Sequence, residues 1–420
     1  MENGSLNVTI GGEAGQGLVT VGTLLAKSLV RSGYFIVGSQ SYYSRVRGGH
    51  NTFSIRASAN PLSSPTEVVD LLVALDEDTI TVERESLDSQ GILLADETFE
   101  TADDSCLRVP YKELAEGRYV NIAVLGVVGY MLGLQEETIG QLLDERFKKK
   151  DEKAAEKNRH ALSNAYKYCV EQSSFPRKEL PKVVHAPKRL MLDASEAISL
   201  AAMSSGVKFC SFYPMTPSTA VPLNLVAHGD KMGVVVEQAE DEIAAINMAI
   251  GASFAGAPSL VATSGGGFAL MVEAISLAGV TETPVVAVLG QRPGPATGLP
   301  TRTEQGDLEI VLHSGHGEYP RPTFTPGTLE QCFHLTRKAF DLAERYQGPA
   351  FVLMDQFLAD SYRAIEPFDL DNLSPVRVGG DPPSEGSEYR RYAFTEDGIS
   401  PRLLPGKTEQ LVKADSHEHT

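Results

Sequence analysis

Four polar or glycine-rich segments in the second half of the chain each follow a short apolar run that is typical of a buried strand. In an open parallel sheet, ligands bind in the crevice outside the carboxyl ends of the strands. We therefore expect a hydroxyl, a carboxylate, a glycine loop and a cation to converge on one crevice. This combination suits a small anionic substrate held beside a cofactor. The four segments are residues 213–219, 237–242, 263–267 and 291–307.

The composition excludes several classes of protein. A length of 420 residues allows two or three domains. The net charge of −18 argues against nucleic acid and against an anionic membrane surface as partners. The longest apolar stretch, residues 122–134, is shorter than the ~20 residues that a membrane helix needs. The N-terminus lacks a basic region followed by an apolar run, so we expect a cytoplasmic protein without a signal peptide.

The cysteines are far apart and form no Cys-x-x-Cys pair, so a self-contained iron–sulfur or zinc site is not expected. Free buried thiols in a reducing compartment are the default for such cysteines. No residue of the chain is therefore predicted as a metal ligand. The cysteines are Cys106, Cys169, Cys210 and Cys332.

The first half of the chain predicts an α/β domain over residues 1–175. It begins with a strand, a glycine-rich turn, a helix and a second strand, which is typical of parallel α/β architecture. These elements are expected at residues 6–10, 11–17, 18–31 and 34–37, with further strands at 68–75 and 91–95, a buried helix at 122–134 and a charged helical region at 136–170.

The second half predicts another α/β domain, over residues 193–367, after a proline-rich linker at 176–192. Asp193 and Glu196 have the spacing of a helix N-terminus. Residues 368–420 are rich in proline, glycine, serine and charge, and show no obvious core. Strands are expected at 207–213, 233–237, 259–263, 284–289 and 350–354, and helices near 218–227, 241–254, 268–278 and 329–346.

A glycine-rich loop links the first strand to the first helix, and its candidate binding residues are Gly12, Gly15, Gln16 and Gly17. Backbone N–H groups of such a loop, together with the helix dipole, favour a phosphate. The loop departs from the dinucleotide fingerprint because Ala14 stands at the second glycine position. It also lacks the lysine of a P-loop. A tight turn without a ligand is the alternative.

Arginines are concentrated shortly after this loop, in residues 41–50 of an otherwise acidic chain. The segment combines two arginines with two tyrosines and a glycine pair. Arginine side chains can grip a phosphate with two parallel hydrogen bonds, so Arg45 and Arg47 are candidate phosphate contacts. A solvated edge strand is the alternative for this segment.

Thr216 and a group of acids are the first candidates in the second domain. Thr216 lies in a turn stiffened by two prolines, which holds its hydroxyl in place for a substrate carboxylate. An ordinary capped turn is the alternative. The helix dipole favours acids at a helix start, so most of the acids that follow need no function. One of these carboxylates could instead polarise a heteroaromatic cofactor, and clustered acids in a partly buried crevice raise the pKa of one of them. The acids are Glu237, Glu240, Asp241 and Glu242.

Later segments add a glycine loop and a cation. Ser264 and Gly265 open the glycine loop, and Arg292 follows a strand where an arginine suits a carboxylate. A surface arginine is the alternative for Arg292. The helix predicted at 241–254 has a face of small residues, so either a neighbouring helix or another subunit is expected to approach it closely.

These segments together resemble the 2-oxoacid:ferredoxin oxidoreductases, in particular an α subunit with a γ domain fused at its N-terminus. The resemblance covers almost the whole chain, and several motifs occur in the family's order. The γ-type motifs are Gly-Glu-Ala-Gly-Gln-Gly at 12–17 and Ser-Tyr-Tyr-Ser-Arg-Val-Arg-Gly-Gly-His at 41–50; the α-type motifs lie at 213–218, 240–245, 263–267, 291–295, 298–301, 304–305 and 396–402.

The resemblance implies the coenzyme A-dependent oxidative decarboxylation of a 2-oxoacid on thiamine diphosphate, with ferredoxin as electron acceptor. In such a protein the α-type domain binds the pyrimidine half of thiamine diphosphate. Thr216 then contacts the substrate, Glu242 bonds N1′ of the aminopyrimidine, and Arg292 binds the substrate carboxylate. The further candidate contacts are Pro214, Ser264 and Gly265 with thiamine diphosphate, and Gly12, Gly15, Gln16, Gly17, Arg45 and Arg47 on the coenzyme A side.

The chain departs from the family's complete set of motifs in two ways. It has neither a Gly-Asp-Gly motif nor cluster cysteines, and the resemblance places these on a separate β subunit that carries Mg²⁺ and an iron–sulfur cluster. We therefore expect the chain to be inactive without that partner. The family's α subunit also continues into a further C-terminal domain, which here is expected to be either truncated or a separate polypeptide.

Two other classes of function stay open at this stage. A nicotinamide- or flavin-dependent oxidoreductase would use the N-terminal loop, but the imperfect glycine spacing argues against it. A non-catalytic scaffold subunit would not need Thr, Glu and Arg at successive strand ends. Among 2-oxoacids, 2-oxoglutarate or a broad range is favoured, with Arg302 as a candidate for a second carboxylate.

Overall fold

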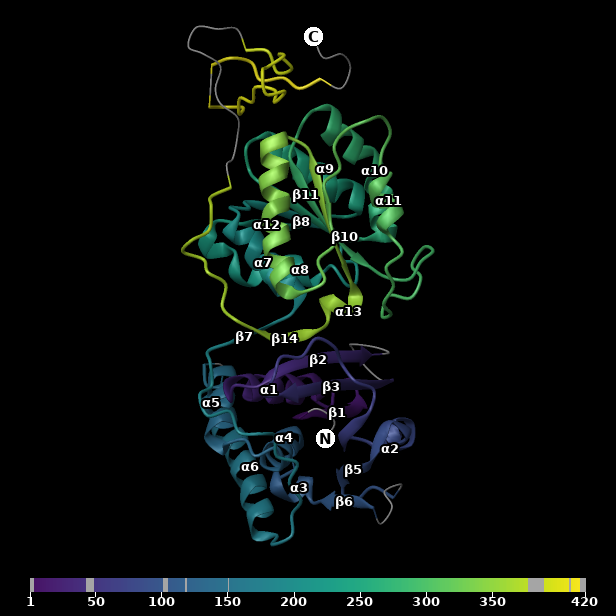
Figure 1. Ribbon diagram of the computed structural model, residues 1–420, viewed down its shortest axis with the longest axis vertical. Helices are drawn as coiled ribbons and strands as arrows, with labels where there is room; N and C mark the ends of the chain where they lie inside the picture. Colours follow the sequence, from purple (N-terminus) through teal and green to yellow (C-terminus); the bar gives the residue numbers. More distant parts are fainter. Residues whose placement is uncertain are drawn as a thin grey trace. The chain divides into compact units, whose positions relative to one another are not determined.

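The chain forms two compact units in the computed structural model, which describes residues 4–42, 49–100, 105–117, 119–149, 151–376, 389–407 and 409–415. The first unit comprises residues 1–192 and 361–367, and the second comprises residues 193–360 and 368–420. Each unit combines a sheet with packed helices, so the predicted α/β class is confirmed (Figure 1).

Among the described residues, the first unit is built on an eight-stranded mixed sheet with the order β6-β5-β4-β1-β3-β2-β14-β7. From β1 to β6 the strands at one side are parallel, whereas β3 is antiparallel to both β1 and β2. The strands are β1 (Ser5–Glu13), β2 (Phe35–Tyr42), β3 (His50–Ser58), β4 (Val69–Ala74), β5 (Leu87–Asp96), β6 (Cys106–Val109), β7 (Leu190–Leu192) and β14 (Tyr362–Ile365).

No strand is expected at 50–58 from the sequence, but β3 lies there and inserts between β1 and β2, antiparallel to both. Buried residues alternate with half-buried ones along this missed strand, at Asn51, Phe53, Ile55 and Ala57. That period of two is the ordinary signal of a strand with one face in the core. The arginines, tyrosines and glycines of the preceding segment obscure this pattern at the start of the strand.

The helices of the first unit follow the predicted pattern, with one division. The charged helical region expected at 136–170 forms two helices, because Asp151 begins the second one by accepting a hydrogen bond from the Ala154 N–H at 3.1 Å. Apolar residues of α1, α4, α5 and α6 share one core with the central strands. The helices are α1 (Leu18–Arg31), α2 (Glu77–Glu83), α3 (Tyr111–Leu114), α4 (Val120–Met131), α5 (Glu136–Phe147) and α6 (Glu152–Glu171).

Two strands from distant parts of the sequence complete the first sheet. β14 is antiparallel to β2 on one side and to β7 on the other. The segment 176–192, expected to be a linker, therefore ends in a strand. The second domain, expected to run to residue 367, gives up its last residues to the first unit, because Arg363 pairs with both Val37 and Leu192.

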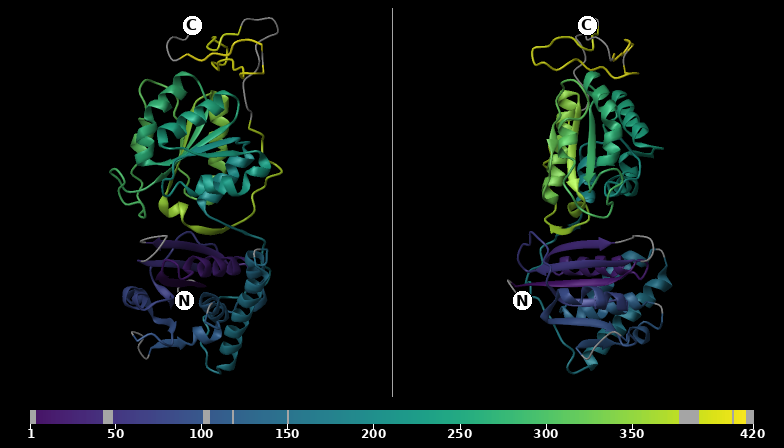
Figure 2. Two further views of the ribbon diagram at one scale, coloured as in Figure 1. Left: turned by 180° about the vertical axis from the view of Figure 1, so that it is seen from behind. Right: turned by 90° about the vertical axis from the view of Figure 1, so that its right-hand side faces the viewer.

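The second unit is built on a sheet that has six strands within the described residues, all parallel, in the order β12-β13-β11-β10-β8-β9. Helices α7 and α12 pack together on one face, and α9 and α10 pack together on the other (Figure 2). β8 has β9 on one side and β10 on the other, so the winding of the chain reverses between β8 and β10. Such a switch point is where open parallel sheets bind ligands.

The elements of the second unit lie close to their predicted positions. The predicted cap at Asp193 is a complete capping box, in which Asp193 and Glu196 each accept the other's backbone N–H. The strands are β8 (Phe209–Phe212), β9 (Val235–Gln238), β10 (Ser259–Ser264), β11 (Val285–Gln291), β12 (Thr323–Phe324) and β13 (Pro349–Asp355); the helices are α7 (Ala194–Ser204), α8 (Ala220–His228), α9 (Glu242–Phe254), α10 (Gly265–Val280), α11 (Leu308–Leu312), α12 (Leu329–Tyr346) and α13 (Gln356–Ala359).

The described residues after 389 contain no helix or strand, as predicted, but buried arginines attach them to the second unit. Arg402 Nη1 forms an ion pair with Glu344 at 2.8 Å, and its Nη2 donates to the Ser253 carbonyl at 2.8 Å. Arg391 Nη2 donates to the Glu282 carbonyl at 2.7 Å. This segment is therefore held to the second unit by polar anchors, and it contributes no buried apolar residue among those described.

Replacing Arg402 by methionine is expected to destabilise the second unit strongly. The side chains of Arg402 and Glu344 are 5% and 2% exposed, so the change leaves a buried carboxylate without its partner. Breaking such a pair costs roughly 3–5 kcal/mol. Thermal unfolding of Arg402→Met can be compared with Lys413→Ala, which removes an exposed pair with Asp415 and should cost at most about 1 kcal/mol. Equal effects of the two changes would contradict this account.

Candidate functional site

Burial separates the four acids that the sequence places together at the start of α9. Glu237, Glu240 and Asp241 are exposed, whereas Glu242 is buried, with 4% of its surface exposed. Asp241 is the helix cap, because its carboxylate accepts the Ala244 N–H at 2.7 Å. The structure therefore leaves Glu242 as the acid that reaches into the interior at the carboxyl edge of the sheet.

Glu242 lies against the first turn of α10. A methyl group added at Gly267 would stand 2.6 Å from Glu242 Oε1 and would also collide with the Thr263 hydroxyl. No described residue donates a hydrogen bond to the Glu242 carboxylate. A buried carboxylate without a donor is costly, so this position suits a ligand that brings an N–H or a protonated ring nitrogen.

Arg292 and Thr216 meet at the ends of β11 and β8. Arg292 Nη1 donates to the Thr216 carbonyl at 2.7 Å, and the arginine is only 7% exposed. Burial lowers the pKa of the Arg292 guanidinium, while the carboxylates of Asp307 and Glu242 raise it. The structure thus brings three predicted site residues, Thr216, Glu242 and Arg292, to one edge of the sheet.

Asp307 is a residue of this site that the sequence analysis did not select. Its carboxylate lies at the N-terminus of α10, where a side chain at Gly265 would collide with it, and its Oδ2 is buried without a hydrogen-bond partner. Burial raises the pKa of Asp307, although the backbone N–H of Arg292 opposes this. In the sequence, the one sign that Asp307 belongs to the site is its position at the end of the loop that begins at Arg292.

The expected glycine loop at 263–267 is wrong, because these residues are the end of β10 and the first turn of α10. The glycines are needed for close approach by Asp307 and Glu242 rather than for a turn. Ser264 is fully buried, and its hydroxyl donates to the Gly290 carbonyl at 2.7 Å, which joins the ends of β10 and β11. Pro214 is exposed at the end of β8.

The N-terminal loop has a different form from the one expected. Gly12 belongs to β1, while Gly15 and Gly17 have φ angles of 103° and 86° that favour glycine. The Glu13 N–H donates to Asp76 Oδ2 at 2.8 Å and to Gln16 Oε1 at 3.1 Å. Because Asp76 already accepts the Glu13 N–H, this amide is not available to a phosphate. The amides at the start of α1 are then the groups of the loop that can bind an anion.

A cavity of about 260 Å³ opens beside this loop, at the carboxyl ends of β4 and β5. Gln16, Lys112 and Asn121 line it, and the hydroxyl of buried Tyr111 has no hydrogen-bond partner there. The cavity lies on the same edge as the glycine loop, and its walls are mainly apolar, with Asp96 as well as Gln16, Lys112 and Asn121 among the polar side chains. Arg45 and Arg47 lie outside the described residues, so their predicted role is not tested by the structure.

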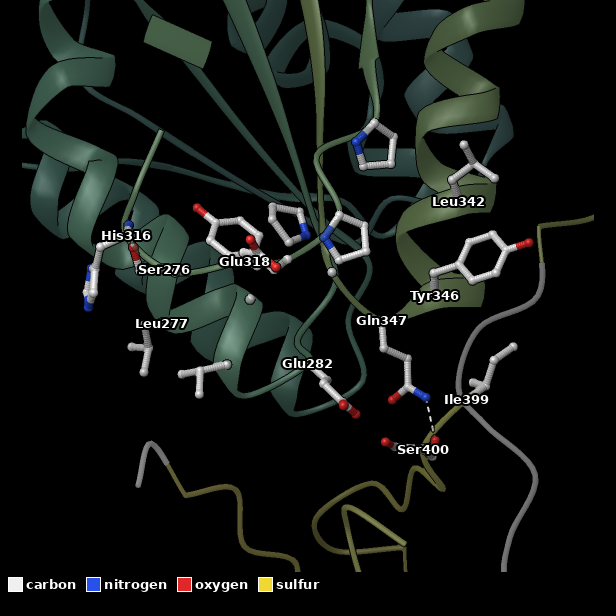
Figure 3. Close-up of a pocket in the computed structure, with 18 of the residues that line it drawn as sticks. Ser276, Leu277, Glu282, His316, Glu318, Leu342, Tyr346, Gln347, Ile399 and Ser400 are labelled. Carbon is white, nitrogen blue, oxygen red and sulfur yellow. Dashed lines mark hydrogen bonds between the residues drawn. The ribbon is translucent and has the colours of Figure 1, made fainter. Parts of the chain in front are cut away.

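A larger cavity, of about 780 Å³, lies away from the predicted site residues (Figure 3). It opens at the amino-terminal edge of the second sheet, between the ends of α10 and α12 and residues 398–400. Gln347 donates there to the Ser400 carbonyl. Size alone would select this cavity, but Glu242, Thr216 and Arg292 do not line it, so we place the candidate site at the opposite edge.

Exposed apolar side chains occur on the helices that begin at the carboxyl edge of the sheet, near the candidate site. Of the small residues on α9, Ala245 and Ala249 are fully buried, whereas Gly251 is exposed and a side chain there would meet no atom within 4 Å. This face of α9 is therefore open to another chain. The exposed apolar residues of these helices and the neighbouring loops include Tyr213, Leu223, Val226, Ile243, Met248, Leu270, Leu299 and Leu308.

Metal and membrane features are absent within the described ranges. No three His, Cys, Asp or Glu side chains of those residues gather in a way that would hold a metal ion, and all four cysteines are free thiols. No helix described by the structure combines the length and the apolar character that crossing a membrane requires.

Two family models match the chain. The model described as "Pyruvate ferredoxin/flavodoxin oxidoreductase" matches residues 7–168. The model described as "Pyruvate flavodoxin/ferredoxin oxidoreductase, thiamine diP-bdg" matches residues 200–419. The thiamine diphosphate-binding model thus covers the unit that carries Thr216, Glu242 and Arg292.

Curated relatives and a solved structure match across the chain. The 2-oxoacid:ferredoxin oxidoreductase subunit alpha of Sulfolobus sp is 33% identical over 481 residues, covering 98% of this chain and 74% of the relative. The 2-oxoglutarate synthase subunit KorA of Archaeoglobus fulgidus is 40% identical over 168 residues, covering 40% of this chain and 49% of the relative. The 2-oxoglutarate:ferredoxin oxidoreductase from Magnetococcus marinus, solved with 2-oxoglutarate, coenzyme A and succinyl-CoA bound, gives a TM-score of 0.87 at 29% identity, covering 99% of this chain and 75% of that one.

Alanine at Gly267 is expected to destabilise the protein, whereas alanine at Gly266 is not. Both glycines lie in the first turn of α10, where Gly→Ala alone would stabilise by up to about 1 kcal/mol. At Gly267 the methyl collides with Glu242 and Thr263, so Gly267→Ala should destabilise by roughly 1–3 kcal/mol. At Gly266 the nearest atom is the Ala296 carbonyl oxygen at 3.3 Å, so Gly266→Ala should be neutral or stabilising. Urea unfolding of both variants tests this, and a stable Gly267→Ala protein would contradict the proximity of Glu242.

Proposed function

This chain belongs to the family of 2-oxoacid:ferredoxin oxidoreductase α subunits, and we propose that its second unit activates thiamine diphosphate and binds the 2-oxoacid. The observation that carries the proposal is the buried Glu242 carboxylate, which lacks a donor and faces Gly267 at the switch point of the sheet. The residues around it fit the aminopyrimidine end of the cofactor, because that ring brings the nitrogen-bound protons that Glu242 lacks.

Glu242 has one role in this proposal, which is to hold a proton at N1′ of the aminopyrimidine. Glu242 is the first residue of α9 and is only 4% exposed, so its carboxylate is largely withdrawn from water. Thiamine diphosphate, when bound, supplies the carbon centre that accepts the electron pair released as the 2-oxoacid loses CO₂. Ser264 and Gly265 shape the floor of this site, with Pro214 at its rim.

Arg292 and Thr216 are proposed to bind the 2-oxoacid. Arg292 uses Nη1 to hold the Thr216 carbonyl, which fixes both the guanidinium plane and the turn that carries the Thr216 hydroxyl. The other guanidinium nitrogen atoms can then meet a carboxylate with two parallel bonds. Asp307 supports this arrangement, because its carboxylate accepts the Arg292 backbone N–H and adds favourable charge beside the guanidinium.

We favour 2-oxoglutarate as the substrate. The support comes from relatives named 2-oxoglutarate synthase and from a solved relative that contains bound 2-oxoglutarate. Arg302, in the loop after β11, is the proposed contact for the second carboxylate that distinguishes 2-oxoglutarate from pyruvate. A cytoplasmic location is proposed as well, since four free thiols suit a reducing compartment.

The proposed β partner packs on the exposed apolar face around the candidate site. α9 presents Ile243, Met248 and Gly251 to the outside, and α8 presents Leu223 and Val226. Exposed apolar side chains of this number mark an interaction surface. The partner is proposed to carry the Mg²⁺ and diphosphate half of the thiamine site and the iron–sulfur cluster that passes electrons to ferredoxin.

The first unit is proposed to serve coenzyme A. Gly15 and Gly17 expose the amides at the start of α1, and the adjoining cavity offers Gln16, Lys112 and Asn121 as polar contacts. Gly12 contributes through β1, and Arg45 and Arg47 are proposed to add phosphate contacts. The support is the cavity together with the solved relative that contains bound coenzyme A.

Replacing Glu242 by glutamine should remove most activity while the assembly with the partner survives. Glutamine has the same shape, but its neutral amide lacks the negative charge that stabilises a proton on N1′. Losing such a role typically costs ~10²–10⁴-fold in rate. The measurement is ferredoxin reduction by the purified complex with 2-oxoglutarate and coenzyme A. Exposed Glu240→Gln is the matched control and should stay near normal. Normal turnover in Glu242→Gln, with loss in Glu240→Gln, would move the role to Glu240.

Arg292→Ala should weaken the use of pyruvate and 2-oxoglutarate alike, because both oxoacids carry the same first carboxylate. A charge-assisted hydrogen bond is worth roughly 1.5–3 kcal/mol. At 1.4 kcal/mol per decade, the Michaelis constant for either oxoacid is expected to rise about 10- to 150-fold. The Michaelis constant for coenzyme A should hardly change. A melting temperature for the variant detects any structural loss from the unpaired Thr216 carbonyl, and a rise confined to coenzyme A would show that the two sites are exchanged.

A further inference from the structure

A groove on the first unit gathers cations over an apolar floor, at a place that the proposed function does not use. Its volume is about 420 Å³, which is in the range of small-molecule sites. It lies between α1, α5 and β7. Its lining residues are the apolar Leu24, Val30, Leu142, Leu190 and Met191, the cations Lys27, Arg31, Arg146 and Arg189, and the single acid Glu145.

The charge of this groove contrasts with the chain's net charge of −18. Glu145 is already engaged, since it forms an ion pair with Arg31, which lowers the pKa of Glu145. Lys27 has neither a hydrogen bond nor an ion pair with any described residue. Arg146 makes a long hydrogen bond to the Thr20 hydroxyl at 3.4 Å. Glu145 also attracts Lys27, so one lining acid faces the four cations of the groove, which keeps a net positive charge.

Arg189 shows that this is a built site rather than a set of surface cations. Its side chain is only 9% exposed, and its guanidinium stacks on the Phe35 ring at 3.6 Å. Nη1 donates to the Gly33 carbonyl at 2.7 Å, and Nε pairs with Glu366 at 3.1 Å. No described residue accepts a hydrogen bond from Nη2. A fixed guanidinium with an unused donor is ready to bind an anion without further ordering.

The groove is separate from the proposed coenzyme A side. The glycine loop precedes the first residue of α1, whereas Lys27 and Arg31 lie in its last turns. With 14 residues at 1.5 Å each, the two ends of α1 are roughly 20 Å apart. Arg146 reaches back to Thr20 in the first turn of α1, but a head group held by Lys27 and Arg189 lies towards the other end of the helix from Gly17.

We propose that this groove binds an amphiphilic anion, a carboxylate or phosphate head group with an aliphatic tail. The head group accepts a hydrogen bond from Arg189 Nη2, and the positive charges of Lys27 and Arg146 attract it. The tail lies on Leu24, Leu142 and the side chains of β7. This contact removes the apolar surface of the tail and of the groove floor from water. Because the proposal uses no residue of the thiamine or coenzyme A sites, it stands independently of the proposed function.

Calorimetric titration of the full chain with four probes tests this proposal: octanoate, octyl phosphate, inorganic phosphate and 1-octanol. Octanoate or octyl phosphate should bind saturably at one site, and higher salt should weaken the binding. A preference between these two identifies the head group. Neutral 1-octanol should not bind. Equal affinity for inorganic phosphate and octyl phosphate would overturn the proposal, because the apolar floor would then contribute nothing.

Two variants connect the binding to these residues. The double change Lys27→Ala with Arg146→Ala removes exposed side chains, and should weaken binding of the better octyl probe at least about 10-fold, the loss of one charge-assisted contact. Lys167→Ala, an exposed cation on α6, is the matched control and should bind normally. Unchanged binding in the double variant, or no saturable binding of either octyl anion to the natural chain, would overturn the proposal.

Discussion

The carboxylate of Glu242 lies against the first turn of α10, where only a glycine leaves room for it. This close approach connects the start of α9 to the end of β10 across the switch point of the sheet. A larger residue at position 267 would displace the acid or the helix. The geometry of the candidate site therefore depends on an absent side chain as much as on the side chains present.

Parallel strands explain why the remaining site residues arrive at the same place. β8, β10 and β11 all end at one edge, so the turn of Thr216, the glycines of α10 and the loop of Arg292 share a crevice. Arg292 then ties β11 to the turn after β8 through the Thr216 carbonyl. At the end of the same loop, the Asp307 carboxylate lies against Gly265 at the start of α10. Hydrogen bonds from Arg292 to the Thr216 carbonyl and from Ser264 to the Gly290 carbonyl join these strand ends to one another.

Charge is unevenly distributed over the first unit. Its glycine-loop edge carries Asp76 close to the amides that the sequence had suggested as a phosphate cradle. Its opposite end carries a cationic groove beside Arg189, although the chain as a whole is strongly acidic. Net charge thus describes the average surface and not the local potential. In the second unit, buried Arg391 and Arg402 perform a further task by holding an irregular segment in place.

The sequence by itself determined the α/β class, the positions of most strands and helices in the second unit, and the family. Apolar periodicity and capping residues such as Asp193 act locally, so the linear pattern records them. Only the tertiary structure separated buried Glu242 from three exposed acids, since neighbours in sequence face different surroundings. It also moved residues 263–267 from a loop to a helix start, placed β3 between β1 and β2, and brought β14 into the first sheet. Pairing partners and close approaches arise between distant residues, and composition or spacing along the chain does not specify them.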